Sequence, residues 1–333
     1  MKPILKLSVI LFMVLTFSSC SSGVVSQSSK ETIGSNGQLV QSSQVQKPIN
    51  IPTIKEIVDT LCSEEFQGRL TGSKGNEKAG EYIGRTFKDI GLDPFFADSF
   101  YESYSQDVIS IYGGDGSDTK VEMVNNVVGF IKGKKSGKAV VISAHFDHLG
   151  YVNGTIIRGA LDNASGVSAL IKIAHTLKEK SKEKPFDTDI IFCAFNGEEN
   201  VLMGSEAFVK EIKSKSVYSD LYNINIDCIG GKEGGKLALK NKSKISSKLY
   251  EAVKTTMKKH NIEFEDVGVV GLGDHLRFES VGIPNVFIVQ ENVKKLVHKP
   301  TDTPDALDYG QIDKIANAIS DFIGVNDGVI FVQ

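Results

Sequence analysis

The stretch Val140-Val141-Ile142-Ser143-Ala144-His145-Phe146-Asp147 places a short, almost wholly apolar run directly before a histidine and an aspartate. A run of this length and composition is typical of a strand buried on both faces of a parallel sheet. In an open α/β sheet, ligands bind beyond the carboxyl ends of the strands. We therefore expect His145 and Asp147 to lie at the edge of the sheet where chemistry takes place.

Three further apolar runs are each followed by side chains that can bind metals. Residues 190–195 precede Glu198 and Glu199, residues 222–226 precede Asp227, and residues 286–289 precede His298 after a short loop, while a glycine-rich turn after residues 140–144 brings Asp162. Because these runs all read as strands of one sheet, we expect the side chains that follow them to gather at one edge.

The remainder of the chain alternates strand-like runs with segments of helical spacing. Strands are expected over residues 108–112, 124–131, 139–144, 189–195, 221–227, 264–270 and 285–289, and helices over 54–62, 73–90, 163–180, 201–213, 246–260 and 312–323. Such alternation predicts an α/β fold, with a mixed, mostly parallel sheet covered by helices on both faces in three layers.

The N-terminal segment has the pattern of a targeting sequence. Lys2 and Lys6 accompany a mostly apolar stretch over residues 7–17, too short to span a membrane, and small residues then precede Cys20. This resembles a bacterial lipoprotein signal, although Phe17 stands where an aliphatic residue is usual. We expect residues 1–20 to be a signal cleaved before a lipidated Cys20, which predicts an extracytoplasmic, lipid-anchored protein of the bacterial cell envelope or a secreted one. Residues 21–47 predict a flexible tether, and residues 48–333 one catalytic domain.

Composition sets further bounds on function. The 333 residues have a formal net charge of -3 and are 41% hydrophobic, so the chain can form one large domain, and no nucleic-acid partner is expected. Beyond Cys20, the remaining cysteines are odd in number and scattered, which predicts buried free thiols at Cys62, Cys193 and Cys228.

The candidate ligands are nitrogen and oxygen donors, a set that suits zinc and also cobalt or manganese: His145, Asp162, Glu199, Asp227 and His298. Their three carboxylates contribute a charge of -3 and their neutral imidazoles none. One divalent ion would leave the site at -1, whereas two ions with a bridging hydroxide would bring it to zero. Charge balance therefore favours a dinuclear centre in which one carboxylate bridges ions that typically lie roughly 3.5–4 Å apart.

Two further carboxylates complete the expected machinery. His145 and Asp147 lie two residues apart on an extended segment and point to the same side, so Asp147 can accept a hydrogen bond from the far ring nitrogen of His145. Glu198 precedes a ligand without having to be one. A carboxylate in that position is the expected general base, which later donates the proton to the leaving amine.

These segments together resemble the two-zinc aminopeptidases, the peptidase family that includes bacterial leucyl aminopeptidases and plasma glutamate carboxypeptidase. The motifs, which extend over nearly the whole chain after the tether, are Phe66–Arg69, Ser143–Gly150, Gly159–Gly166, Phe195–Glu199, Asn225–Gly230 and His298–Pro304. The resemblance implies that Asp162 bridges two zinc ions. It further implies that His145 and Asp227 hold one ion and Glu199 and His298 the other, with Glu198 as general base and Asp147 orienting the site.

Other positions are less determined. The segment Gly273-Asp274-His275 resembles the one that lines the family's substrate pocket, so Asp274 and His275 are pocket candidates, although His275 could instead serve a structural role at a helix start. The remaining histidines are assigned to structure or solvent: His148, His175 and His260.

The chain departs from the family pattern in two places. Many members carry tyrosine immediately before the last histidine, where its hydroxyl can help hold the oxyanion, but this position is Val297 here, which leaves the oxyanion donor open. The segment between the second helix and Asn126 is too short for the protease-associated insert of some relatives, so we expect open access for substrate.

The leading hypothesis is an exopeptidase that removes N-terminal residues from peptides with a free N-terminus. A carboxypeptidase or dipeptidase could use the same site. A glutaminyl-cyclase-like aminoacyltransferase has similar ligands around one zinc but typically lines its pocket with tryptophan, which this chain lacks. A non-catalytic binding protein would be expected to have lost ligands or the base. Substrate side-chain preference, oligomeric state and the metal used in the cell stay open.

Overall fold

The computed structural model describes residues 50–109, 119–135, 137–240, 243–265, 272–291 and 293–332, all of which belong to one unit, Ile49–Gln333. The expected signal and tether, including Cys20, lie outside the described residues. The same holds for residues 110–112 and 266–270 of two expected strands.

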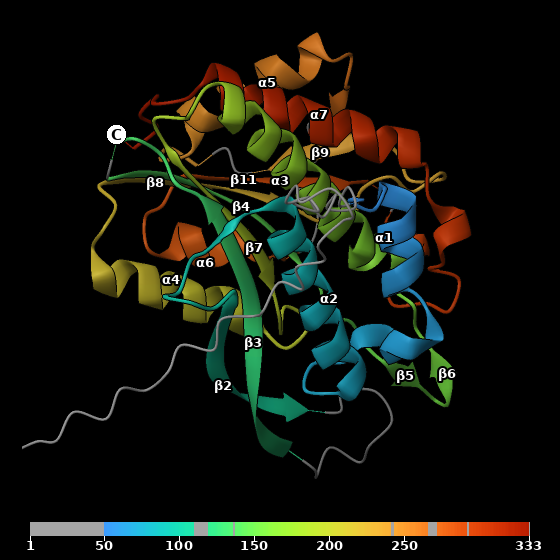
Figure 1. Cartoon of the computed structure of the whole chain (residues 1–333). Coiled ribbons are helices and arrows are strands. Elements are labelled where there is room, and N and C mark those ends of the chain that lie inside the picture. Colours follow the sequence, from blue (N-terminus) through green and yellow to red (C-terminus); the bar gives the residue numbers. More distant parts are fainter. Residues whose placement is uncertain are drawn as a thin grey trace, which may run out of the picture. The chain divides into compact units, whose positions relative to one another are not determined.

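Within these residues, nine strands form one mixed sheet in the order β1-β3-β7-β4-β8-β11-β9-β10, with β2 paired to β3 (Figure 1). The central strands run parallel to one another: β7 (Asp189–Phe195), β4 (Lys138–His145), β8 (Asp220–Ile226) and β11 (Asn285–Gln290). The flanking strands are β1 (Asp93–Pro94), β2 (Tyr101–Ile109), β3 (Thr119–Ile131), β9 (Leu237–Lys240) and β10 (Phe264–Glu265), while β5 (Tyr151–Val152) and β6 (Thr155–Ile156) pair separately. The expected α/β fold is confirmed.

Helices cover both faces of the sheet, and the central strands contribute alternate side chains to each layer. Val140, Ile142 and Ala144 of β4 join the larger core, whereas Ala139 and Val141 join the smaller one. The larger core lies under α1 (Ile54–Leu61), α2 (Lys74–Ile90), α3 (Ser165–Glu183), α5 (Ser247–Lys259) and α7 (Tyr309–Val325), and the smaller one under α4 (Met203–Lys215) and α6 (His275–Ser280) (Figure 1). This division gives the three layers that the alternation predicted.

Local signals explain where the first helices begin and end. Thr53 and Glu56 form a capping box at the start of α1, each side chain accepting from the other's backbone N–H. Ser73 caps α2, and Gly91 ends it in the left-handed conformation that glycine adopts without a steric penalty. These helices flank a 3₁₀ segment, Glu64–Arg69. The last two residues of this segment are also the first two of the loop at residues 68–72.

The edge strands are where the structure extends beyond the sequence prediction. The strand expected at 108–112 begins at Tyr101. Its first part was missed because residues 101–107 are mostly polar and contain no apolar run. Strand β9 was not anticipated either. No helix in the described residues is long and apolar enough to cross a membrane.

Candidate metal centre

The parallel strands bring the predicted ligands to one edge of the sheet. His145 is the last residue of β4, Asp227 directly follows β8, and Glu199 lies four residues after the end of β7. Asp162 sits in a π-helical turn, Ala160–Ala164, that precedes α3, and His298 follows β11 through a loop. Each ligand position is thus set by the end of a buried central strand or by the segment that leaves it.

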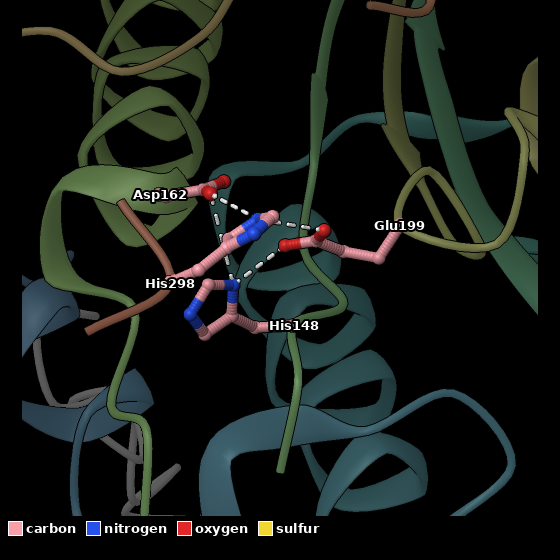
Figure 2. Close-up of side chains that lie close together, drawn as sticks. All are labelled: His148, Asp162, Glu199 and His298. Atoms are coloured by element: carbon pink, nitrogen blue, oxygen red, sulfur yellow. Dashed lines mark hydrogen bonds and ion pairs between the residues drawn. The ribbon is translucent and has the colours of Figure 1, made fainter. Parts of the chain in front are cut away.

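The ligand atoms form two groups that share Asp162. His145 Nε2 lies 3.2 Å from Asp162 Oδ1 and 3.4 Å from Asp227 Oδ1. His298 Nε2 lies 3.3 Å from Asp162 Oδ2 and 3.0 Å from Glu199 Oε2 (Figure 2). Zinc bonded to nitrogen and oxygen at about 2.0–2.1 Å in a tetrahedron would separate neighbouring ligand atoms by roughly 3.3 Å. The spacing in both groups is compatible with a coordination shell.

The chemistry of the buried atoms also fits a cation. Asp227 Oδ1 is buried and makes no hydrogen bond to the described residues, although a buried carboxylate oxygen is costly to leave unpaired. Glu198, Glu199 and Asp162 lie close together, and among the described residues the cationic groups that face them include the imidazoles of His145, His148 and His298. A divalent ion in each group would supply positive charge and, at Asp227 Oδ1, a partner in addition to the His145 ring 3.4 Å away.

His148 lies inside this site, although the sequence analysis assigned it to structure or solvent. Its Nδ1 is 2.7 Å from Glu199 Oε1, and together with Asp162, Glu199 and His298 it offers ligand atoms that all lie within 4.8 Å of one another (Figure 2). A separation of 2.7 Å is the length of a hydrogen bond rather than of a coordination edge. The His148 ring therefore donates to one oxygen of Glu199 and leaves the other facing His298.

Asp147 orients the site by a different route from the one expected. His145 Nδ1 lies 3.7 Å from its carboxylate, beyond hydrogen-bond range, and 3.3 Å from its carbonyl oxygen. The carboxylate instead accepts from the backbone N–H groups of Glu198 and Glu199 and from the Thr71 hydroxyl, at 3.1–3.2 Å. The two carboxylate oxygens are thus already occupied, and Asp147 fixes the loop that carries the expected base and one ligand.

Two side chains that were not assigned a role hold the turn around Asp162. The fully buried Asp302 accepts from the backbone N–H groups of Leu161, at 2.6 Å, and Asp162, at 3.1 Å. Asn163, joined to Asp162 by a cis peptide bond, accepts from Cys228 N–H and donates to Ile226 O. These bonds tie the Asp162 turn to the end of β8, where Asp227 lies. Asp302 lies within a quoted motif, but a lone aspartate gives no signal of such a contact.

The protonation states reflect the concentration of charge. Burial raises the pKa of Glu198 well above its ordinary value, and the neighbouring Glu199 and Asp227 add to this. Burial opposes protonation of His145, but Glu198 and Asp227 outweigh it and raise its pKa well above the usual range. Hydrogen bonds to Asp162 and Glu199 raise the pKa of His298 to about 11. Since a metal binds only neutral imidazole, loading the site requires these protons to leave.

Two further predicted positions, Asp274 and His275, lie at the start of α6. Asp274 is fully buried, and burial raises its pKa to about 7. His275 is the first residue of α6 and stacks on Phe287 with ring centroids 4.3 Å apart. Val297 packs against the core, so the structure assigns no oxyanion donor there. Away from the site, His260 pairs with Asp321, and the predicted free, buried thiols are confirmed at Cys62, Cys193 and Cys228.

Fold and cluster together define an α/β protein with a candidate metal centre at the carboxyl edge of its parallel strands. The chain belongs to peptidase family M28, whose family model matches residues 126–323. The expected resemblance to the two-zinc aminopeptidases is thereby confirmed.

Individual relatives agree with this assignment. Aminopeptidase YwaD of Bacillus subtilis is 26% identical over 204 residues, which cover 59% of this chain but 43% of that protein. The glutamate carboxypeptidase 2 homolog of Caenorhabditis elegans is 31% identical over 119 residues, 34% of this chain and 14% of that protein. The chain thus spans less than half the length of these relatives.

Solved structures share the fold at lower identity. The zinc aminopeptidase BSAP of Bacillus subtilis superposes with a TM-score of 0.62 at 17% identity, over 84% of this chain and 96% of that one. A glutaminyl cyclase of Porphyromonas gingivalis gives a TM-score of 0.65 at 19% identity, over 83% and 98%. At this level of identity, both comparisons speak for the fold alone.

Proposed function

We propose that this protein is a dinuclear zinc exopeptidase that removes N-terminal residues from peptides. The observation that carries the proposal is the position of Asp162, whose two oxygens face two separate ligand groups at 3.2–3.3 Å. Asp162, His145 and Asp227 would hold one ion, and Asp162, Glu199 and His298 the other. Bound in this way, two zinc ions would acidify the attacking water and polarise the substrate carbonyl.

Glu198 is the proposed general base. The Asp147 carboxylate holds the Glu198 and Glu199 amides side by side, so that Glu199 serves as a ligand while Glu198 stays available for proton transfer. A carboxylate whose pKa is raised by burial is suited to take a proton from water and to return it to the leaving amine near neutral pH. The acidic surroundings favour a substrate that carries a positively charged, free N-terminus.

A glutaminyl-cyclase-like aminoacyltransferase is the second candidate function, because a glutaminyl cyclase shares the fold. In its favour is a TM-score of 0.65. Against it stand the absence of tryptophan from the chain and the presence of both ligand groups, where a cyclase-like centre uses one zinc. A carboxypeptidase or dipeptidase could use the same metal centre and would differ in how the termini of the peptide are bound.

The cellular setting is part of the proposal. The lipoprotein-like segment at residues 1–20 supports an enzyme anchored at, or released from, the bacterial cell envelope, acting on extracytoplasmic peptides. Radiolabelled lipid incorporation, compared with that of a Cys20→Ala variant, would test the anchor. Label retained by the variant would contradict it.

The activity is tested with a mixed peptide library. Zinc-loaded protein should remove single N-terminal residues from free peptides and leave the same library untouched after N-acetylation, as read by mass spectrometry. Loss of C-terminal residues, or cyclisation of peptides that begin with glutamine, would instead establish one of the other candidates.

A further inference from the structure

The loop at residues 68–72 carries a fully buried arginine, Arg69, that has no role in the proposed catalytic mechanism. Arg69 is 0% exposed and adopts a left-handed backbone conformation, with φ of 55°. Its side chain donates four hydrogen bonds to backbone carbonyl oxygens. Burying a guanidinium ion is costly, so the donation of four of its five N–H groups to carbonyl oxygens marks a built arrangement.

The carbonyls that Arg69 contacts belong to the two segments that carry the metal ligands. Nε donates to Phe146 O, between His145 and Asp147, at 2.8 Å, and Nη2 donates to Gly159 O, three residues before Asp162, at 2.8 Å. Nη1 donates to Arg158 O at 2.8 Å and to Leu61 O, at the end of α1, at 2.6 Å. One planar group thus spans both ligand segments.

The backbone around Arg69 strengthens this connection. The Arg69 carbonyl accepts from His148 N–H at 3.1 Å, and the Gly68 carbonyl accepts from Gly150 N–H at 2.9 Å. Two residues further on, Thr71 donates to the Asp147 carboxylate at 3.1 Å. The loop at residues 68–72 therefore binds the segment after β4 through its backbone carbonyl groups and through the side chains of Arg69 and Thr71.

We propose that Arg69 is a positioning residue that sets the distance between the His145 segment and the Asp162 turn, and thereby the affinity of the metal centre. Its fixed fork of N–H donors can reach carbonyls in several directions at once, whereas the three donors of a lysine radiate from one nitrogen. The inference rests on the proposed metal site, because the two segments it joins are those that would share an ion.

The test compares Arg69→Lys with wild type and with Arg158→Lys as the matched control. Arg158 is the neighbour of Gly159 and also donates to a carbonyl, Cys62 O, at 2.7 Å, but it contacts neither ligand segment through its side chain. Zinc affinity is measured by competition with a chromophoric chelator on protein shown to be folded by circular dichroism. Outer contacts of metal ligands typically contribute about 10–100-fold in affinity, and we expect a loss in this range for Arg69→Lys and none for Arg158→Lys.

A second measurement separates this inference from the proposed function. Amide hydrogen exchange of the metal-free protein should become faster in residues 145–150 and 159–164 of Arg69→Lys, while exchange in β11 and α7 stays unchanged. Arg69→Ala with millimolar guanidinium ion should regain protection in both segments. Unchanged exchange there, or zinc affinity within twofold of wild type, would overturn the proposal. Because hydrogen exchange is measured on metal-free protein, it tests whether Arg69 holds the two segments in place even if wild-type protein binds no zinc.

Discussion

The two halves of the candidate metal centre are built in different ways. The half formed by His145 and Asp227 stands directly on the ends of two neighbouring parallel strands, and its side chains are 1% and 9% exposed. The half formed by Glu199 and His298 lies on loops, and the His298 side chain is 38% exposed. The sheet fixes the first half. In the second half, Glu199 accepts a hydrogen bond from the His148 ring and its backbone N–H donates to the Asp147 carboxylate, so we expect this half to be the more easily perturbed.

Asp162 is the element common to both halves, so its loss should have the largest effect. Asp162→Asn removes a negative charge from both ligand groups and should abolish binding of both ions and all peptidase activity. Metal content after dialysis, measured by elemental analysis, checks this. The control is Asp220→Asn, which changes a buried aspartate at the start of β8. Full metal content in Asp162→Asn would contradict a role for Asp162 in both ligand groups.

Glu198 is a ligand in neither half, so a Glu198 variant should lose catalytic activity without losing metal. Glu198→Ala should retain the metal content of wild type but lose roughly 10²–10⁴-fold in kcat, the usual contribution of a general base. Steady-state kinetics on a leucyl peptide, together with elemental analysis, would show both effects. Turnover near that of wild type would remove Glu198 from its proposed role.

Proton release should differ between the wild-type centre and one without His298. At pH 7 the His298 imidazole, with a pKa of about 11, is protonated in the metal-free protein, and it must become neutral to bind an ion. Zinc affinity should therefore rise by about tenfold per pH unit for each proton displaced. Calorimetry in buffers of different ionisation enthalpy should show about one proton fewer released by His298→Ala. Equal release would mean that His298 does not meet the metal.

The smallest expected effect concerns His148. His148→Ala leaves Glu199 without its 2.7 Å partner and should weaken metal binding in the second half by about tenfold, at the low end for an outer contact. His148→Asn can still donate an N–H and should recover most of that loss. His260→Ala, at the end of α5, serves as the control. Identical affinities for His148→Ala and wild type would assign the ring to packing alone.

The same contrast explains how much the sequence could predict. His145 and Asp227 directly follow apolar runs, so these runs alone placed them, and Glu198 and Glu199 lie within four residues of another strand. Long-range hydrogen bonds leave no such pattern. Asp302 reaches Leu161 across 141 residues and Arg69 reaches Gly159 across 90, which only the folded chain reveals.

The expected bond from His145 to the Asp147 carboxylate shows the limit of arguments from spacing. Residues two apart on a strand point to the same side, and Asp147 is indeed at the site, but its oxygens bind the amides of the next loop instead. The sequence analysis also assigned His148 to structure or solvent, although it lies at the site. At a strand end the backbone turns, so alternation no longer tells which way a side chain points.

The central claim is that Asp162 joins two metal ions in one centre. Anomalous diffraction at the zinc absorption edge, from crystals of zinc-loaded protein, tests it directly. The account predicts two peaks, one among His145, Asp162 and Asp227 and one among Asp162, Glu199 and His298. A single peak, or peaks away from Asp162, would contradict the account.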